Sequence, residues 1–251
     1  MFALTRQIGE LECCELTYRS REPIDLGRAR QQHHLYEQLL QHLGLEVVSL
    51  PAEPGLPDAV FVEDAAVVLD ECALLPTMGA ASRRPEVESL VPALRAHRPI
   101  VRLGTTGTLD GGDVLRLGRT LYVGLSTRTN AAGIAALRHH AAPFGYDVRA
   151  VPVQGCLHLK SACTALDSNT LLVNPERVDQ SHFRDLEFVT VSPDEPDAAN
   201  VLWIGEAVVA STCFPRTLER IAAHGSRVLP LDNSELVKAE GGLTCTSLLF
   251  D

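Results

Sequence analysis

The chain has 251 residues, and its 22 basic and 32 acidic residues give a formal charge of −10. This excess of acids argues against nucleic acid or an anionic membrane as a partner, because both select basic surfaces. No apolar run approaches the length of a spanning helix, and the start at Met1-Phe2-Ala3-Leu4 lacks the layout of a secretory signal. We therefore expect a globular protein of the cytoplasm.

Five similar segments follow one another along the chain. Each pairs a polar or glycine-containing start with two short apolar strands around a tight turn, and they begin at Pro57, Asp110, His158, Ala199 and Glu240. Their spacing of roughly 40 to 55 residues is typical of repeat architectures. The fifth segment ends after one strand, and we expect the N-terminal strand to supply its partner and close a ring.

Helical patterns lie between these segments. Residues 28–43 carry leucines at helical spacing, with Gly44 as the predicted stop. Ser126 is the predicted cap of a helix in the middle of the chain. Pro215 suits the first turn of another, which should end near Gly225. Strand pairs that alternate with helices five times predict a closed α/β ring around a central channel.

The C-terminal segment holds one cysteine, Cys245, in a β-favouring run directly after Gly241-Gly242. Two glycines let the backbone turn tightly and leave room for close approach. A thiol placed there is a candidate nucleophile when a base and a charged group lie elsewhere in the chain. His158 supplies an imidazole, and Asp110 and Asp113 flank another glycine pair. By spacing alone, either acid can orient the imidazole.

The remaining cysteines argue for a reducing compartment. The chain has seven cysteines, scattered and without a metal-type CxxC pair. Reduced thiols are therefore expected rather than a disulfide framework or a metal site.

Six segments carry a resemblance to a known family. In chain order they read PDAVFVEDAAVV, SRR at 82–84, LDGGDVL, VGLSTRTN, LHLKS and GGLTCTSLLF. Together they resemble dimethylarginine dimethylaminohydrolases, members of the guanidine-modifying pentein superfamily. The resemblance implies a five-bladed α/β propeller with pseudo-fivefold ββαβ repeats and a single catalytic domain over residues 1–251. It also implies hydrolysis of Nω-methylated arginines to citrulline and a methylamine, without cofactor or metal.

The residue types suit this chemistry. Cys245 as thiolate would attack the guanidinium carbon, and the resulting covalent thiouronium would then be hydrolysed. His158 would protonate the departing amine and afterwards activate water. The resemblance favours Asp110 over Asp113 as the residue that orients His158.

Arginine carries a guanidinium, an ammonium and a carboxylate, so its site needs acids at two places and an arginine at the third. The resemblance implies that Glu63 and Asp64 hold the guanidinium and that Asp58 faces the amino end. Arg83 and Arg128 match the carboxylate ligands of the family. The full set of expected substrate-binding residues is Leu16, Asp58, Phe61, Glu63, Asp64, Arg83, Arg128 and Glu240.

Two departures from the family pattern bear on substrate range. Glu240 stands where relatives commonly carry Asp, and the segment 13–19, expected to form a lid near the site, is only loosely similar. Arg84, beside Arg83, is an alternative carboxylate ligand.

Three other functions remain in view. Arginine deiminase uses the same chemistry but carries His-x-Asp where this chain has His158-Leu159-Lys160. Without that acid, the site would bind an unmethylated guanidinium less tightly and would have room for methyl groups. A hydrolase of another modified arginine is the second alternative. A non-catalytic ribosome-binding propeller is the third, although it would not need Cys245, His158 and Asp110. We expect a small-molecule substrate and leave a homodimer open.

Overall fold

In the computed structural model, residues 1–251 form fifteen β-strands and five α-helices. The strands are β1 (Phe2–Arg6), β2 (Glu46–Leu50), β3 (Val67–Val68), β4 (Ala73–Leu75), β5 (Ile100–Arg102), β6 (Val114–Leu117), β7 (Thr120–Leu125), β8 (Asp147–Pro152), β9 (Cys163–Ala165), β10 (Thr170–Val173), β11 (Glu187–Thr190), β12 (Leu202–Ile204), β13 (Ala207–Ser211), β14 (Arg227–Leu231) and β15 (Leu248–Phe250). The helices are α1 (Leu26–His42), α2 (Pro85–Arg95), α3 (Ala131–Ala141), α4 (Pro215–Ala223) and α5 (Ser234–Lys238).

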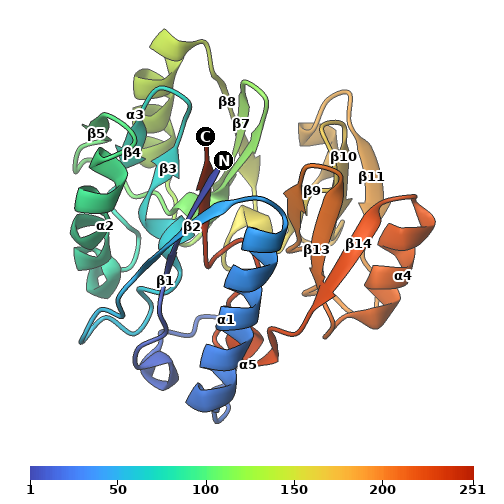
Figure 1. The fold of residues 1–251 in the computed structure, drawn as a ribbon. Helices are drawn as coiled ribbons and strands as arrows, with labels where there is room; N and C mark the ends of the chain where they lie inside the picture. The colour runs from blue at the N-terminus through green and yellow to red at the C-terminus, as the bar shows by residue number, and fades with distance from the viewer.

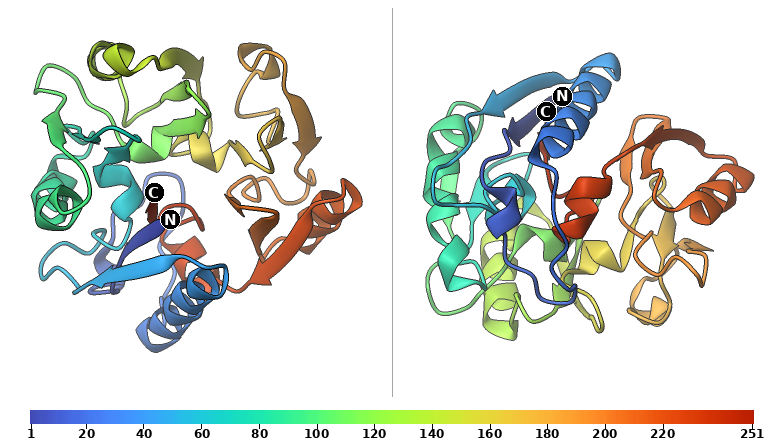
Figure 2. Two further views of the ribbon diagram at one scale, coloured as in Figure 1. Left: turned by 45° about the horizontal axis from the view of Figure 1, so that its top comes forward. Right: turned by 90° about the horizontal axis from the view of Figure 1, so that it is seen from below.

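The strands form five three-stranded sheets with one repeated pattern. In each sheet the middle strand pairs antiparallel with one neighbour and parallel with the other, as β7 does with β6 and β8. A parallel pair needs a crossover connection, and α1, α2, α3 and α4 each supply one on the outside of the ring (Figures 1 and 2). The fold is a five-bladed α/β propeller, as expected from the repeats.

The two ends of the chain close the ring. β1 pairs antiparallel with β15, with Phe2 opposite Phe250, and parallel with β2. The N-terminal ammonium of Met1 lies 3.7 Å from the Asp251 carboxylate, and Figure 1 shows the two termini side by side. The predicted closure by the N-terminal strand is confirmed.

The first strands of the sheets line the centre. A cavity of about 240 Å³ is bordered by residues of β3, β6, β9, β12 and β15, among them Val68, Leu115, Ala165 and Leu249. Lys160 and Glu63 also border it. This cavity is the predicted central channel.

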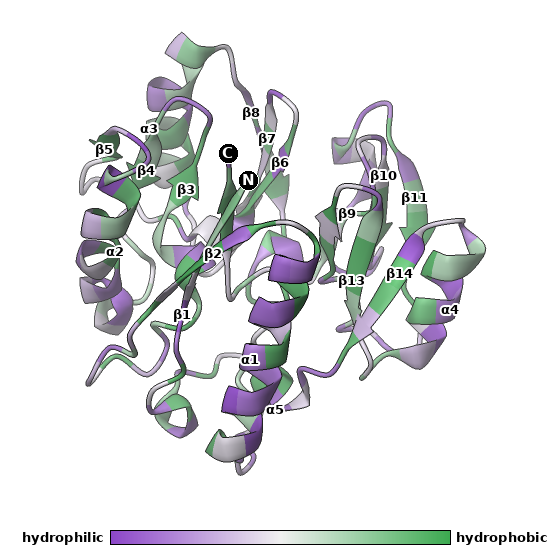
Figure 3. Ribbon diagram, viewed as in Figure 1, coloured by the Kyte–Doolittle hydropathy of each residue, from purple (hydrophilic) through white to green (hydrophobic).

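Apolar side chains fill the space between neighbouring blades. Ile134 and Leu137 of α3 and Val123 of β7 share one buried cluster with Val67 and Leu74 of the neighbouring blade. In Figure 3, α1 and α4 show alternating hydrophilic and hydrophobic stretches, which is typical of helices that bury one face. No helix is both long enough and apolar enough to cross a membrane.

The helix ends were predicted partly correctly. α1 and α4 are followed by Gly44 and Gly225, both with the positive φ expected of a stop. Ser126 is not a cap: α3 begins after Asn130, whose side chain accepts the Gly133 N–H. The Ser126 hydroxyl oxygen instead accepts the backbone N–H groups of Arg128 and Thr129, which lie in the loop before α3. Helices α2 and α5 were not predicted.

The blade of β9, β10 and β11 lacks a helix, although five helices, one for each blade, were expected. Only a 3₁₀ turn, Gln180–His182, lies between β10 and β11. The side chains of Asn174 and Asp179 each accept a backbone N–H from two residues further along. Such turns compete with helix formation in this connection.

Candidate active site

The predicted site residues lie in short turns that precede the first strands of the blades. These turns are the 3₁₀ segments Val62–Ala65, Gly111–Asp113 and Leu159–Ser161, and the turn at 243–246. The expectation that Cys245 and His158 lie in strands was wrong, because β15 and β9 begin only after these turns. Turns from different blades meet at one end of the ring, and the Glu63 N–H donates to the Cys245 carbonyl across two of them.

His158 lies between two carboxylates. Its Nε2 is 3.1 Å from Oδ2 of Asp110, and its Nδ1 is 3.6 Å from Oδ1 of Asp64. Burial lowers the pKa of His158, but Asp64, Asp110 and Asp113 outweigh burial and raise this pKa to about 9. The imidazole is therefore held in its protonated form.

Asp110 and Asp113 have different partners. Asp110 accepts the Gly79 N–H through its other oxygen, which fixes the carboxylate toward the ring. Asp113 accepts the Leu159 N–H at 2.8 Å and the Ser126 hydroxyl at 2.6 Å, and it makes no hydrogen bond to the imidazole. Burial raises the pKa of Asp113 to about 6. Asp110 therefore contacts the imidazole of His158, whereas Asp113 accepts the backbone N–H of Leu159.

The glycine pair between these acids permits this arrangement. A Cβ on Gly112 would lie 2.5 Å from Oδ1 of Asp64 and 2.7 Å from Nδ1 of His158. No side chain fits there, so glycine is required for the imidazole and carboxylate to approach the backbone.

Cys245 is buried and makes a specific contact with the backbone. The Gly242 N–H donates to its Sγ at 3.3 Å. Burial, followed by the charges of Glu63 and Asp64, raises the pKa of the thiol well above its usual range. The thiol is neutral at rest, and a cation bound beside it would favour the thiolate.

The second glycine pair allows close packing around Cys245. A Cβ on Gly241 would lie 2.4 Å from the Phe61 ring. Phe61 and Cys245 belong to one apolar cluster, and Leu16 packs against it. Phe61 and Leu16 thus border the thiol with apolar surface.

Arg83 is fully engaged within the protein. Its Nη1 donates to Asp64 at 2.8 Å, and its Nε and Nη2 donate to the two oxygens of Glu86 at 3.0 and 2.8 Å. The side chain is 4% exposed. Asp64 and Glu86 thus pair with Arg83, and the alternative carboxylate ligand Arg84 is an exposed residue that donates to the Met78 carbonyl.

Arg128 differs because part of its guanidinium has no partner. Its Nη2 donates to the Thr17 hydroxyl at 3.2 Å and lies 3.6 Å from Glu15, whereas its Nη1 is buried without a hydrogen bond. A buried donor left without a partner is costly in free energy. Arg128 is thus suited to receive an anionic group.

Glu63 and Asp64 are neighbours in sequence but have different partners. Glu63 accepts from the Lys160 ammonium and the Thr244 hydroxyl, both at 2.6 Å. Lys160 lies in a 3₁₀ turn rather than on a strand face with His158. Glu63 is therefore paired with Lys160, whereas Asp64 lies beside the imidazole of His158.

The segment 13–19 covers the site. Asp58 accepts the Glu15 N–H at 3.1 Å, and burial raises the pKa of its carboxyl. Glu240 has a φ of 58°, and its carboxylate accepts the backbone N–H groups of Thr17, Tyr18 and Arg19. Glu240 thus contacts the predicted lid.

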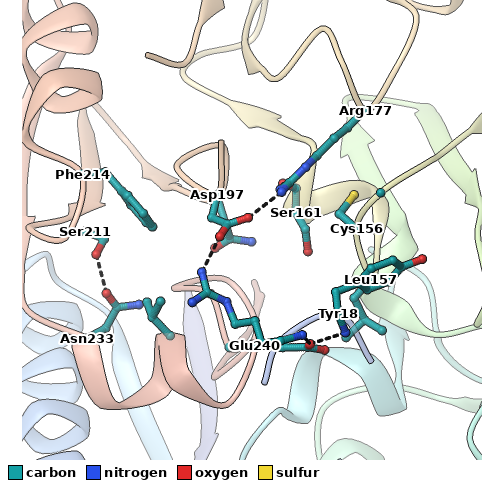
Figure 4. A pocket seen from close by; sticks show the side chains of 16 residues that line it. Tyr18, Cys156, Leu157, Ser161, Arg177, Asp197, Ser211, Phe214, Asn233 and Glu240 are labelled. Carbon is teal, nitrogen blue, oxygen red and sulfur yellow. Dashed lines mark hydrogen bonds and ion pairs between the residues drawn. The ribbon is translucent and has the colours of Figure 1, made fainter. Parts of the chain in front are cut away.

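A second cavity of about 250 Å³ adjoins the site. Glu240, Gly241 and Gly242 form one side of it, while Cys245 and His158 do not line it. Figure 4 shows Arg177 pointing toward Asp197, to which it donates at 2.6 Å. The glycine pair separates this cavity from the thiol.

Sequence reasoning missed Glu86 and the pairing of Lys160. Glu86 was detectable in part, since an acid three residues after Arg83 at a proline-marked helix start forms an i,i+3 pair. The partner of Lys160 lies in another blade, and no local pattern predicts it.

Comparison with known proteins gives consistent matches. A family model described as "N,N dimethylarginine dimethylhydrolase, eukaryotic" matches residues 14–246. N(G),N(G)-dimethylarginine dimethylaminohydrolase of Pseudomonas aeruginosa is 36% identical over 232 residues, 90% of each chain. The enzyme of that name from Streptomyces coelicolor is 39% identical over 240 residues, 93% of this chain and 90% of the other.

A solved structure extends the likeness to three dimensions. The Pseudomonas aeruginosa protein, as a cysteine-to-serine mutant complexed with citrulline, matches with a TM-score of 0.94 and 33% identity. The match covers 99% of this chain and 98% of that one.

Proposed function

Because the chain belongs to the dimethylarginine dimethylaminohydrolase family, we propose that it hydrolyses Nω-methylated L-arginine to L-citrulline and a methylamine. It is a hydrolase of C–N bonds other than peptide bonds. The observation that best supports the proposal is the placement of the His158 imidazole between Asp64 and Asp110, at the end of the ring where Cys245 lies. An acid–base group, its orienter and a thiol are the groups that this reaction needs.

The first half of the proposed reaction forms a covalent intermediate. The bound guanidinium lowers the pKa of Cys245, and the thiol loses its proton to solvent, since His158 is already protonated. The thiolate attacks the guanidinium carbon to give a neutral tetrahedral adduct. Protonated His158 then transfers its proton to the methylated nitrogen, and the amine leaves, so that a cationic thiouronium and a neutral imidazole remain.

The second half regenerates the enzyme. Neutral His158 takes a proton from water, whose oxygen attacks the thiouronium carbon. The new adduct expels Sγ of Cys245 as a thiolate, and the hydroxyl loses its proton as the C=O of the ureido group of citrulline forms. This proton restores the neutral thiol. Asp110 and Asp64 stabilise the imidazolium at the start and again after water has been activated.

The substrate groups are assigned from charge. Asp64 binds the guanidinium, since Glu63 is already paired with Lys160. Arg128 binds the α-carboxylate through its partnerless Nη1, and Asp58 faces the amino end. Because Glu63 is paired with Lys160, the site does not satisfy every N–H of an unmethylated guanidinium, which favours methylated substrates over free arginine.

We also propose how the protein is organised. Residues 1–251 act as one catalytic domain. All seven cysteines are free, which suits the reducing cytoplasm. A homodimer is proposed as its assembly, and light scattering on the purified protein measures the mass that decides this.

The test compares substrates. The protein is incubated with asymmetric dimethylarginine, monomethylarginine, free arginine and hydroxyarginine, and citrulline is measured for each, with Cys245→Ser as the control. We expect citrulline from the methylated arginines and none from the Cys245→Ser variant. Citrulline only from free arginine would overturn the proposal in favour of a deiminase.

A further inference from the structure

A buried row of alternating charges runs from α2 to the catalytic imidazole. Glu86 pairs with Arg83 through two bonds of 3.0 and 2.8 Å, and Arg83 pairs with Asp64 at 2.8 Å. Asp64 lies 3.6 Å from His158, which lies 3.1 Å from Asp110. Each member of the row has an opposite charge on either side, except at the two ends.

Glu86 is the outermost member and has no place in the reaction itself. It is 3% exposed, it lies in the first turn of α2, and both of its oxygens are bonded to Arg83. A carboxylate is favourable at a helix N-terminus, but that position does not require burial. The two parallel bonds give its contact with Arg83 a fixed geometry.

We propose that Glu86 is a positioning residue, which holds the Arg83 fork and cancels its charge so that Asp64 stays an effective anion toward His158 and the substrate guanidinium. The part of this inference that concerns substrate rests on the proposed function. The part that concerns His158 does not.

The electrostatic reason is local. Arg83 carries a full positive charge at 2.8 Å from Asp64, on the side away from the imidazole. Unopposed, that charge would offset the attraction that Asp64 exerts on His158 and on a guanidinium. Glu86 offsets it instead, because its two carboxylate oxygens accept from Nε and Nη2, along the edge of the guanidinium that Asp64 leaves open.

The surroundings of Glu86 bring the pKa of its carboxyl close to neutral pH. Burial raises its pKa, Arg83 opposes this, and the charges of Asp58 and Asp64 add to the rise, so that the pKa is about 7. Loss of its charge below that pH would weaken Asp64 in the same way as a neutral substitution. The acid side of the pH profile of activity should therefore include the titration of Glu86.

The chain offers a matched control. Glu88 is two residues further along α2, is exposed, and makes a two-bond pair with Arg102 at 2.6 and 2.9 Å. Glu86→Gln and Glu88→Gln therefore remove the same charge and the same kind of ion pair from one helix. Only the first is connected to the imidazole.

The experiment has a readout in the absence of substrate. The pKa of His158 is measured by NMR in the wild type, in both variants and in His158→Asn, which identifies the signal. Glu86→Gln should lower the pKa of His158, whereas Glu88→Gln should leave it unchanged. Equal pKa values of His158 in the wild type and Glu86→Gln would overturn the proposal.

Kinetics tests the part that concerns substrate. Glu86→Gln should raise KM for monomethylarginine by roughly tenfold or more, as expected for a weakened buried charge pair, with a smaller effect on kcat. The double variant Glu86→Gln/Arg83→Met removes both charges and should recover part of this loss. A double variant no better than Glu86→Gln contradicts an action through Arg83.

Glu86→Asp covers the case in which Glu86→Gln does not fold. It keeps the charge and shortens the side chain, so the pKa of His158 should stay close to that of the wild type. A pKa of His158 that falls in Glu86→Asp while its fold is intact would refute a role of the charge. A wild type that makes no citrulline from any methylarginine refutes the proposed function but leaves the NMR result valid.

Discussion

Replacing Asp110 by Asn removes the charge that lies 3.1 Å from Nε2 of His158. A hydrogen bond to a charged group contributes about 1.5–3 kcal/mol, which corresponds to about one to two pH units in the pKa of the partner. The pKa of His158, about 9 in the wild type, should fall by that amount. The imidazole also loses its orienter, and kcat should fall by roughly a hundredfold or more.

Asp113→Asn is the matched control for this substitution. Asp113 is equally buried and adjoins the same glycine pair, but it accepts from the Leu159 N–H and the Ser126 hydroxyl instead of the imidazole. Asp113→Asn should lower the melting temperature, and it should lower the pKa of His158 less than Asp110→Asn does. NMR titration of His158 and steady-state citrulline formation measure both variants. A larger fall in the pKa of His158 for Asp113→Asn would show that Asp110 has been wrongly assigned.

Three further substitutions follow from the contacts. Glu240→Ala removes the acceptor of three backbone N–H groups of the lid, so hydrogen exchange at Thr17–Arg19 should become faster and KM should rise; unchanged exchange contradicts the contact. Lys160→Met leaves Glu63 buried without its partner and should cost about 3–5 kcal/mol in unfolding free energy, which Lys160→Met/Glu63→Gln should partly restore in urea titrations. The pKa of His158 is raised in the folded state, so its stabilising contribution is full below about 6.5 and is lost as the pH rises through about 9. The melting temperature of the wild type should therefore fall across that range more than that of His158→Asn, and parallel curves would contradict the raised pKa.

Much of the ring was predictable because its signals are local. Gly44 and Gly225 end their helices at positive φ, and the strand pairs repeat at a regular spacing. The turns before β9 and β15 were not predictable, since a run of apolar residues with one polar residue suits a 3₁₀ turn as well as a strand. For the same reason His158 and Cys245 were correctly selected but assigned to the wrong local structure.

The partners of the site residues were harder to predict than their identities. Asp110 and Asp113 have the same spacing to the glycine pair, and only the tertiary structure shows which one faces His158. Arg83 was expected to face a ligand, yet Glu86 and Asp64 occupy its donors. Such pairings join residues of different blades or depend on side-chain direction, which a linear pattern does not contain.

The central claim is that Cys245 and His158 act on methylated guanidinium groups. The most direct measurement is the ratio of kcat/KM for asymmetric dimethylarginine to that for free arginine, with citrulline as the product followed. We expect a preference of roughly ten- to a hundredfold for the methylated substrate, because an unmethylated N–H donor left unpaired in the site costs about 1–3 kcal/mol. An equal or higher kcat/KM for free arginine would contradict it.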